Sequence, residues 1–158
     1  DLCRATRDTV VEGTESSFGG TPTEVRLSAF WKGVALAPHR TLVVGRLDGI
    51  IAGALQLVRP NPLTEAGPYV AEIMTFFVAP WARGHGLARM MVETAEAVAR
   101  GKGIRILDVS MRANRRRAIA LFESLGYARW GEKEHYAFIG GKFVAGLYFS
   151  KSLDVPLP

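Results

Sequence analysis

The segment "FFVAPWARGHGLARMMVETAEAVARGKG", residues 76–103, most constrains what this chain can fold into. An apolar, β-branched and aromatic run stops at Pro80, and a helical pattern begins after Gly84 and Gly86. The first N–H groups of a helix have no partner within it, and the helix dipole adds about half a positive charge there. Because glycines let an anion approach these groups, the segment predicts a strand, a phosphate-binding loop and a helix. The alternative is that the glycines serve only the geometry of the turn.

The rest of the chain predicts further strands and helices around this unit. Residues 23–36 read as a helix, and residues 40–58 as two strands around the turn signal Asp48-Gly49. A loop is expected over residues 61–68 by composition. The chain then continues with a strand, a helix and two strands, over residues 104–111, 115–127, 128–139 and 143–153. This order predicts an α/β fold, a mixed central sheet flanked by helices.

Helical spacing predicts which faces of the helices are buried. In the early helix the stripe runs through Val25, Ser28/Ala29, Lys32 and Leu36, with Phe30 and Trp31 adjoining it. In the helix that follows the glycines the stripe comprises Leu87, Met90, Met91, Thr94, Ala95 and Val98. The last helix is expected to bury Ala118, Leu121, Phe122 and Leu125.

Composition narrows the class of protein. With 158 residues, 48% hydrophobic and 22% charged, the chain fits one globular domain, residues 1–158. It has no apolar run of the ~18 residues that suggest a membrane span and no signal-peptide pattern at its start, so we expect a cytoplasmic protein without a membrane partner. The lone Cys3 and the scattered His39, His85 and His135 show no metal-binding spacing, so we expect no metal.

The net charge of +5 suits an anionic partner. Its densest part is "MRANRRRA", with Arg112, Arg115, Arg116 and Arg117. Such a run is typical of a solvated helix start, but it can also bind a small phosphorylated ligand or nucleic acid. We favour the ligand and expect no nucleic-acid partner.

Three stretches resemble the GNAT superfamily of N-acetyltransferases. The string V-x-P-x-x-R-G-x-G-x-A, from Val78 to Ala88, resembles its acetyl-CoA-binding segment. "AIALFESLGY" is similar to its A-I-x-L-Y-x-x-L-G-F signature, and "GLYFSKSL" to its closing strand. The resemblance implies the order β-α-α-β-β-β-α-β-α-β-β and transfer of an acetyl group from acetyl-CoA to a primary amine of a small molecule, protein or peptide.

The resemblance also implies a set of cofactor-binding residues. The pyrophosphate of acetyl-CoA would lie on the backbone N–H groups from Arg83 to Ala88, and the pantetheine arm would pair with the backbone around Val78. The full set is Phe77, Val78, Arg83, Gly84, His85, Gly86, Leu87, Ala88, Asn114 and Arg115.

The candidate catalytic residues match the family's pattern less closely than the cofactor-binding residues do. Attack on a thioester needs a neutral amine and therefore a base. Glu72 is the candidate, because it is similar in position to the general base of some relatives and an apolar strand would raise its pKa. The family's usual acid, a tyrosine, is replaced here by Phe122, and the base position of other relatives is Ser110. Tyr136 and Tyr148 are possible replacements for the acid, and Tyr127 is expected in the core.

The alternative reading is a catalytically silent acyl-CoA-binding sensor or interaction module, which the missing tyrosine motivates. In the family the acceptor pocket is shaped by the early helices, the loop before the central strand and the last hairpin. Here these contain Phe30, Trp31, residues 61–69, Glu132 and Glu134. The acceptor, the acyl chain length and the oligomeric state stay open, a homodimer being one option.

Overall fold

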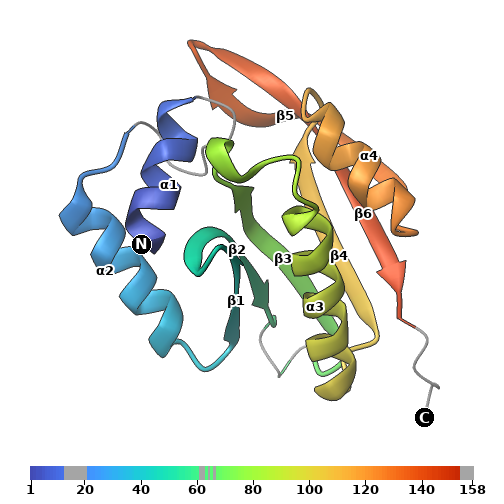
Figure 1. Cartoon of the computed structure of the whole chain (residues 1–158). Coiled ribbons are helices and arrows are strands. Elements are labelled where there is room, and N and C mark those ends of the chain that lie inside the picture. The colour runs from blue at the N-terminus through green and yellow to red at the C-terminus, as the bar shows by residue number, and fades with distance from the viewer. Residues whose placement is uncertain (13–20, 61–62, 64, 66, 154–158) are drawn as a thin grey trace.

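A six-stranded mixed sheet forms the centre of the computed structural model, which describes residues 1–12, 21–60, 63, 65 and 67–153 (Figure 1). The strand order is β1-β2-β3-β4-β6-β5. Much of the predicted loop over residues 61–68 lies outside the described residues. The elements are α1 (Leu2–Val11), α2 (Glu24–Leu36), β1 (Arg40–Leu47), β2 (Ile50–Val58), β3 (Val70–Val78), α3 (Leu87–Gly101), β4 (Ile106–Arg112), α4 (Arg116–Ser124), β5 (Ala128–Ile139) and β6 (Lys142–Ser152).

The hairpin of β1 and β2 confirms the turn predicted at Asp48-Gly49. Both residues have positive φ, 50° and 81°, which is the backbone geometry that matches the twist of two antiparallel strands. The hairpin brings Arg40, at the start of β1, opposite Val58 at the end of β2.

The centre of the sheet opens between β3 and β4. These strands run parallel and pair from Val70 with Ile106 to Ile73 with Val109, where the register ends. Just beyond, β3 carries an irregularity against β2, and Thr75 has a φ of 50°. Strand β4 meanwhile continues beside β6 as far as Arg112. The two strands therefore separate at the middle of the sheet, which leaves backbone on both sides of the gap open to a ligand.

Helices cover both faces of the sheet (Figure 1). On one face α3 and α4 pack over a core that includes Leu55, Leu107, Phe122 and Phe149. On the other face α1 and α2 lie over β1 and β2. There the Trp31 indole is buried beside Phe77 and donates a hydrogen bond to Thr6 Oγ1 at 3.1 Å.

Two predicted helix stripes were partly wrong. In α2, Val25 and Leu36 are 79% and 83% exposed, and the buried residues are Leu27, Trp31 and Val34. The buried set has helical spacing too, and the large indole of Trp31 selects it by packing against α1 and the sheet. In α3, Met90 is 61% exposed, whereas Val92 and Ala99 are buried with Leu87, Met91 and Ala95.

The structure also tests the expected order of elements and the expected burial of Tyr127. The family order implied an initial strand, but the described chain starts with α1. The remaining order of elements is as predicted, and Tyr127 is buried in the core, 3% exposed. Among the described helices, none combines the length and apolar character that crossing a membrane requires.

Candidate functional site

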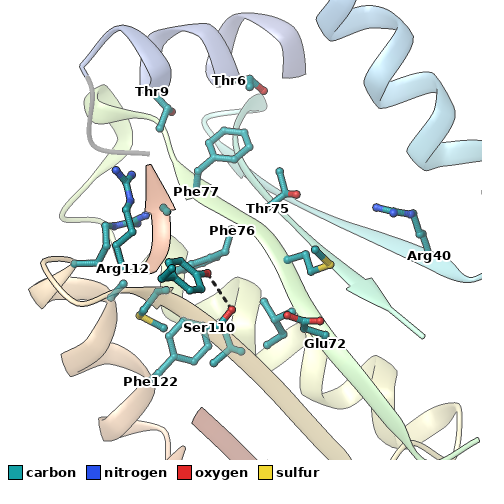
Figure 2. Close-up of a pocket in the computed structure, with 18 of the residues that line it drawn as sticks. Thr6, Thr9, Arg40, Glu72, Thr75, Phe76, Phe77, Ser110, Arg112 and Phe122 are labelled. Atoms are coloured by element: carbon teal, nitrogen blue, oxygen red, sulfur yellow. Dashed lines mark hydrogen bonds between the residues drawn. The ribbon is translucent and has the colours of Figure 1, made fainter. Parts of the chain in front are cut away.

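Two cavities meet at the gap between β3 and β4. The acceptor-side cavity, of about 570 Å³, lies against α1 and α2 and is drawn in Figure 2. The cofactor-side groove, of about 910 Å³, runs between the start of α3 and α4. Four residues line both: Phe76, Arg112, Arg115 and Ala118. One molecule can therefore reach from the groove through the gap into the cavity.

The loop before α3 presents backbone to the groove. Gly84 and Gly86 have φ of 81° and 75°, values that disfavour most residues with a side chain. Gly86 caps α3 and has no side chain with which to bond the first N–H groups of the helix, and an anion binds well at such a helix start. The His85 Nδ1 lies 3.0 Å from the Arg83 carbonyl oxygen, so the ring is turned toward the loop.

Six arginines line the groove: Arg83, Arg89, Arg112, Arg115, Arg116 and Arg117. Arg83 is held in place by a hydrogen bond from its Nε to the Val78 carbonyl oxygen at 3.3 Å and by an ion pair with Glu12 at 2.6 Å. Arg89 donates to Ser124 Oγ at 2.7 Å, which ties α3 to α4. Guanidinium groups around exposed helix N–H groups form a suitable site for a phosphate or diphosphate.

The predicted cofactor-binding residues divide between the two cavities and the core. Seven of them line the groove: Val78, Arg83, Gly84, Gly86, Ala88, Asn114 and Arg115. Phe77 lines the acceptor-side cavity instead. Leu87 is buried, 8% exposed, where it packs against the sheet. The basic run at the start of α4 is thus part of the groove.

Glu72 lies in the acceptor-side cavity (Figure 2). It pairs in register with Val58 of β2 and with Asp108 of β4. Burial raises the pKa of the Glu72 carboxyl above its usual 4.5, and the neighbouring negative charge of Asp108 raises it further. A carboxylate with a raised pKa is a suitable proton acceptor near neutral pH.

Tyr136 lies in the same cavity, and its phenol oxygen is 3.0 Å from Ser110 Oγ. An irregularity in β5 between Lys133 and Ala137 positions it. Its ring packs directly on Gly146, where an added Cβ would lie 2.1 Å from the ring, so only glycine fits. The last two strands, β5 and β6, therefore fix the position of Tyr136, which lies across the sheet from Glu72 of β3.

The other aromatic candidates lie further from the cavity space. Tyr148 packs edge-on against Tyr136, with ring centroids 6.0 Å apart, and is not among the cavity-lining residues of the described chain. Phe122 touches the cavity but is fully buried, with its ring packed edge-on against Phe76 and Tyr127.

Sequence reasoning identified some of the acceptor-side residues and missed others. Phe30 lines the cavity, whereas Trp31 is in the core. Glu132 and Glu134 are exposed, and neither is among the described residues that line this cavity. The polar lining residues that were missed are Thr6, Thr9, Arg40 and Thr75. No local pattern marks them, because they come from three separate elements and meet only in the folded sheet.

Comparison with known proteins identifies the family of the chain. The model of the acetyltransferase (GNAT) family matches residues 8–127. Over 117 residues the chain is 45% identical to the "uncharacterized N-acetyltransferase in hisH-hisA intergenic region" of Azospirillum brasilense, covering 74% of this chain and 70% of that protein. Over 105 residues it is 30% identical to the N-alpha-acetyltransferase RimI of Mycobacterium tuberculosis, covering 66% of this chain and 63% of the relative.

Solved structures share the fold. The structure of yncA from Salmonella typhimurium, which holds its cofactor acetyl-CoA, superposes with a TM-score of 0.80 at 16% identity, over 99% of this chain and 89% of that one. The family match, over residues 8–127, covers most of the chain. The chain therefore belongs to the GNAT family of acetyl-CoA-dependent acyltransferases.

Proposed function

We propose that the protein transfers an acetyl group from acetyl-CoA to a primary amine, with Glu72 as the general base. One observation supports this most: a carboxylate with a raised pKa lies in a cavity that joins the arginine-lined groove through the gap between β3 and β4. The chain acts as one acetyl-CoA-binding domain.

The residues of the groove bind the co-substrate. Its diphosphate lies on the N–H groups between Arg83 and Ala88, and Arg116 and Arg117 provide positive charge at the groove. The backbone at the end of β3, around Val78, pairs with the pantetheine arm on its side toward the gap. Acetyl-CoA supplies the activated acetyl group as a thioester.

Two side chains then handle protons. Glu72 accepts the proton of the acceptor's ammonium group, which leaves a neutral nitrogen with a lone pair for attack on the thioester carbon. Tyr136 donates a proton to the sulfur as the carbon–sulfur bond breaks, and its phenolate takes up the proton that the attacking nitrogen loses as the amide forms. Phe122, at the position of the family's usual tyrosine, has no proton to give, and Tyr136 is the phenol that the fold places in the cavity.

Replacing the base separates this proposal from a silent acyl-CoA-binding module. Glu72→Gln should lower kcat on an amine panel on the order of 100-fold or more, while acetyl-CoA affinity measured by calorimetry stays unchanged. Glu134→Gln, an exposed carboxyl on β5, is the matched control and should leave both quantities unchanged. Tyr136→Phe should lower kcat with the same unchanged affinity.

Folding of the variant can be checked by its melting temperature. Because the pKa of Glu72 is raised in the folded state, the stability that this group contributes is present below pH 4.5 and is lost as the pH rises through the folded pKa. Glu72→Gln should therefore not lower the melting temperature at pH 7. Wild-type protein that binds acetyl-CoA but acetylates no amine would support the silent module instead.

A further inference from the structure

Arg40 and Glu72 project from one face of the sheet. Arg40 pairs with Val58, and Val58 pairs with Glu72, so the three residues form one row across β1, β2 and β3. Residues directly opposite one another in antiparallel strands place their side chains on the same face. With strands spaced roughly 4.8 Å apart, the Cα atoms of Arg40 and Glu72 are about 10 Å apart. Both side chains line the acceptor-side cavity (Figure 2).

A chain of partly buried hydrogen bonds fixes the guanidinium of Arg40. Its Nη1 donates to Gln56 Oε1 at 2.6 Å, and Gln56 is fully buried. Gln56 Nε2 in turn donates to Thr75 Oγ1 at 2.9 Å. Thr75 is the residue with a φ of 50° where β3 leaves β4. The position of Arg40 is thereby coupled to the point at which the cavity opens.

Arg40 has unused capacity to bind an anion. A guanidinium carries five N–H donors, and the described contacts of Arg40 are those to Gln56 and, from Nε, to His39 Nε2 at 3.3 Å. Within the described part of the chain, no carboxylate forms an ion pair with it. The other arginines of the cavity, Arg112 and Arg115, also line the cofactor-side groove. Arg40 lines the cavity and is not among the described residues that line the groove.

The cavity therefore has a negative and a positive end. Glu72, with Asp108 in register beside it, suits the ammonium group of an acceptor. Arg40, half-buried and pre-oriented, suits a carboxylate or another planar or tetrahedral anion. Phe30, Met74 and Phe77 provide apolar surface beside both ends. A polyamine would be repelled by Arg40, and the amino terminus of a peptide would bring no carboxylate of its own backbone to it.

We propose that the acceptor is a zwitterionic small molecule, an α-amino acid with an apolar side chain, whose carboxylate binds Arg40 while its amine lies at Glu72. This assignment rests on the proposed acetyltransferase function and names its substrate class. Arg40 acts as a specificity-determining residue and takes no part in the bond-making step.

Matched acceptors test the assignment. The probes are L-leucine, L-leucinamide and 3-methylbutylamine, which share a side chain and differ in the carboxylate, together with a leucine-initiated peptide amide. Wild-type enzyme should show the highest kcat/KM with L-leucine. Arg40→Met should lower kcat/KM for L-leucine roughly 10- to 100-fold, mainly through KM, and should change the value for 3-methylbutylamine by less than about twofold. Arg40→Lys should restore part of the loss.

Controls separate the recognition role from a structural one. Arg46→Met, which removes a cation elsewhere on β1, should leave all four acceptors unaffected; Arg46 bonds to the Gly49 carbonyl oxygen at the hairpin turn. An equal loss of activity toward all acceptors in Arg40→Met would show that Arg40 only supports the fold of the cavity. Preference of the wild type for the amine, the amide or the peptide would overturn the assignment while leaving acetyl transfer intact. Acetyl-CoA binding without acetylation of any probe would instead count against the proposed function and the assignment together.

Discussion

The cofactor-side groove and the acceptor-side cavity are built in different ways. The groove is made of two short segments, residues 76–89 and 112–121, each of which runs from the end of a strand through a loop into a helix, and arginine side chains line it. The cavity is made of side chains from α1, α2, β1, β3, β4, α4 and β5, and its polar groups lie far apart in the sequence. A site for a common diphosphate can be built locally, whereas a site for a particular acceptor needs the whole sheet.

The groove and the cavity also differ in what restricts amino-acid substitution at their residues. In the groove, positive φ at Gly84 and Gly86 restricts the sequence, although the space around both is open. In the cavity, hydrogen bonds and packing position the side chains, as in the link from Arg40 through Gln56 to Thr75. Substitutions in the groove should therefore change cofactor affinity, and substitutions in the cavity should change rate and acceptor choice.

A change of pH should alter kcat/KM more strongly than the removal of positive charge from the groove alters acetyl-CoA binding. Glu72 must be deprotonated to accept a proton, so kcat/KM should fall about tenfold for each pH unit below the pKa of this group. Because burial and Asp108 raise that pKa, the fall should begin above pH 4.5. The measurement is kcat/KM from pH 5 to 9 for the wild type and Asp108→Asn. The variant should shift the acid limb to lower pH, and an unshifted limb would show that another group titrates.

Removing positive charge from the groove should have a smaller effect, and on binding alone. Arg116 and Arg117 are exposed and line the groove. The double variant Arg116→Ala/Arg117→Ala should weaken acetyl-CoA binding about tenfold at low salt, with less difference at high salt. Arg4→Ala/Arg26→Ala removes the same charge from α1 and α2 and is the matched control. Equal weakening by both pairs would indicate a general charge effect.

Most of the fold could be predicted because its signals are local. The Asp48-Gly49 turn, the proline and glycines around residue 80–86 and the alternating strands each specify their own element. The exposed faces of α2 and α3 could not be fixed in this way. Two sets of residues in α2 have helical spacing: the buried set Leu27, Trp31 and Val34, and the predicted stripe through Val25. The Trp31 indole packs against α1 and the sheet, and only this packing determines which set is buried.

The residues of the candidate site also divide into those that a local sequence signal marks and those that only the folded sheet brings together. The glycine loop and the basic run of α4 were visible as short motifs, and the structure brings them together in one groove. Glu72 became a candidate through the resemblance to GNAT relatives and through its place in an apolar strand. Arg40 and Gln56 were not visible, because their partnership spans β1, β2 and β3 and depends on the register between those strands.

The most direct test of the account is a calorimetric titration with acetyl-CoA of the wild type, Gly86→Asn and Gly86→Asp. Asparagine and aspartate both tolerate positive φ, and nothing lies within 4 Å of a Cβ added at Gly86, so the pair differs mainly in charge. Gly103→Asp, with a φ of 73° and the same open space beyond the far end of α3, is the folding control.

A diphosphate site on the N–H groups at the start of α3 predicts that the wild type and Gly103→Asp bind acetyl-CoA equally well and that Gly86→Asp binds it roughly tenfold or more weakly than Gly86→Asn, because its carboxylate faces the diphosphate. Equal binding by Gly86→Asp and Gly86→Asn, or no binding by the wild type, would contradict it. The glycines would then serve only the turn before α3.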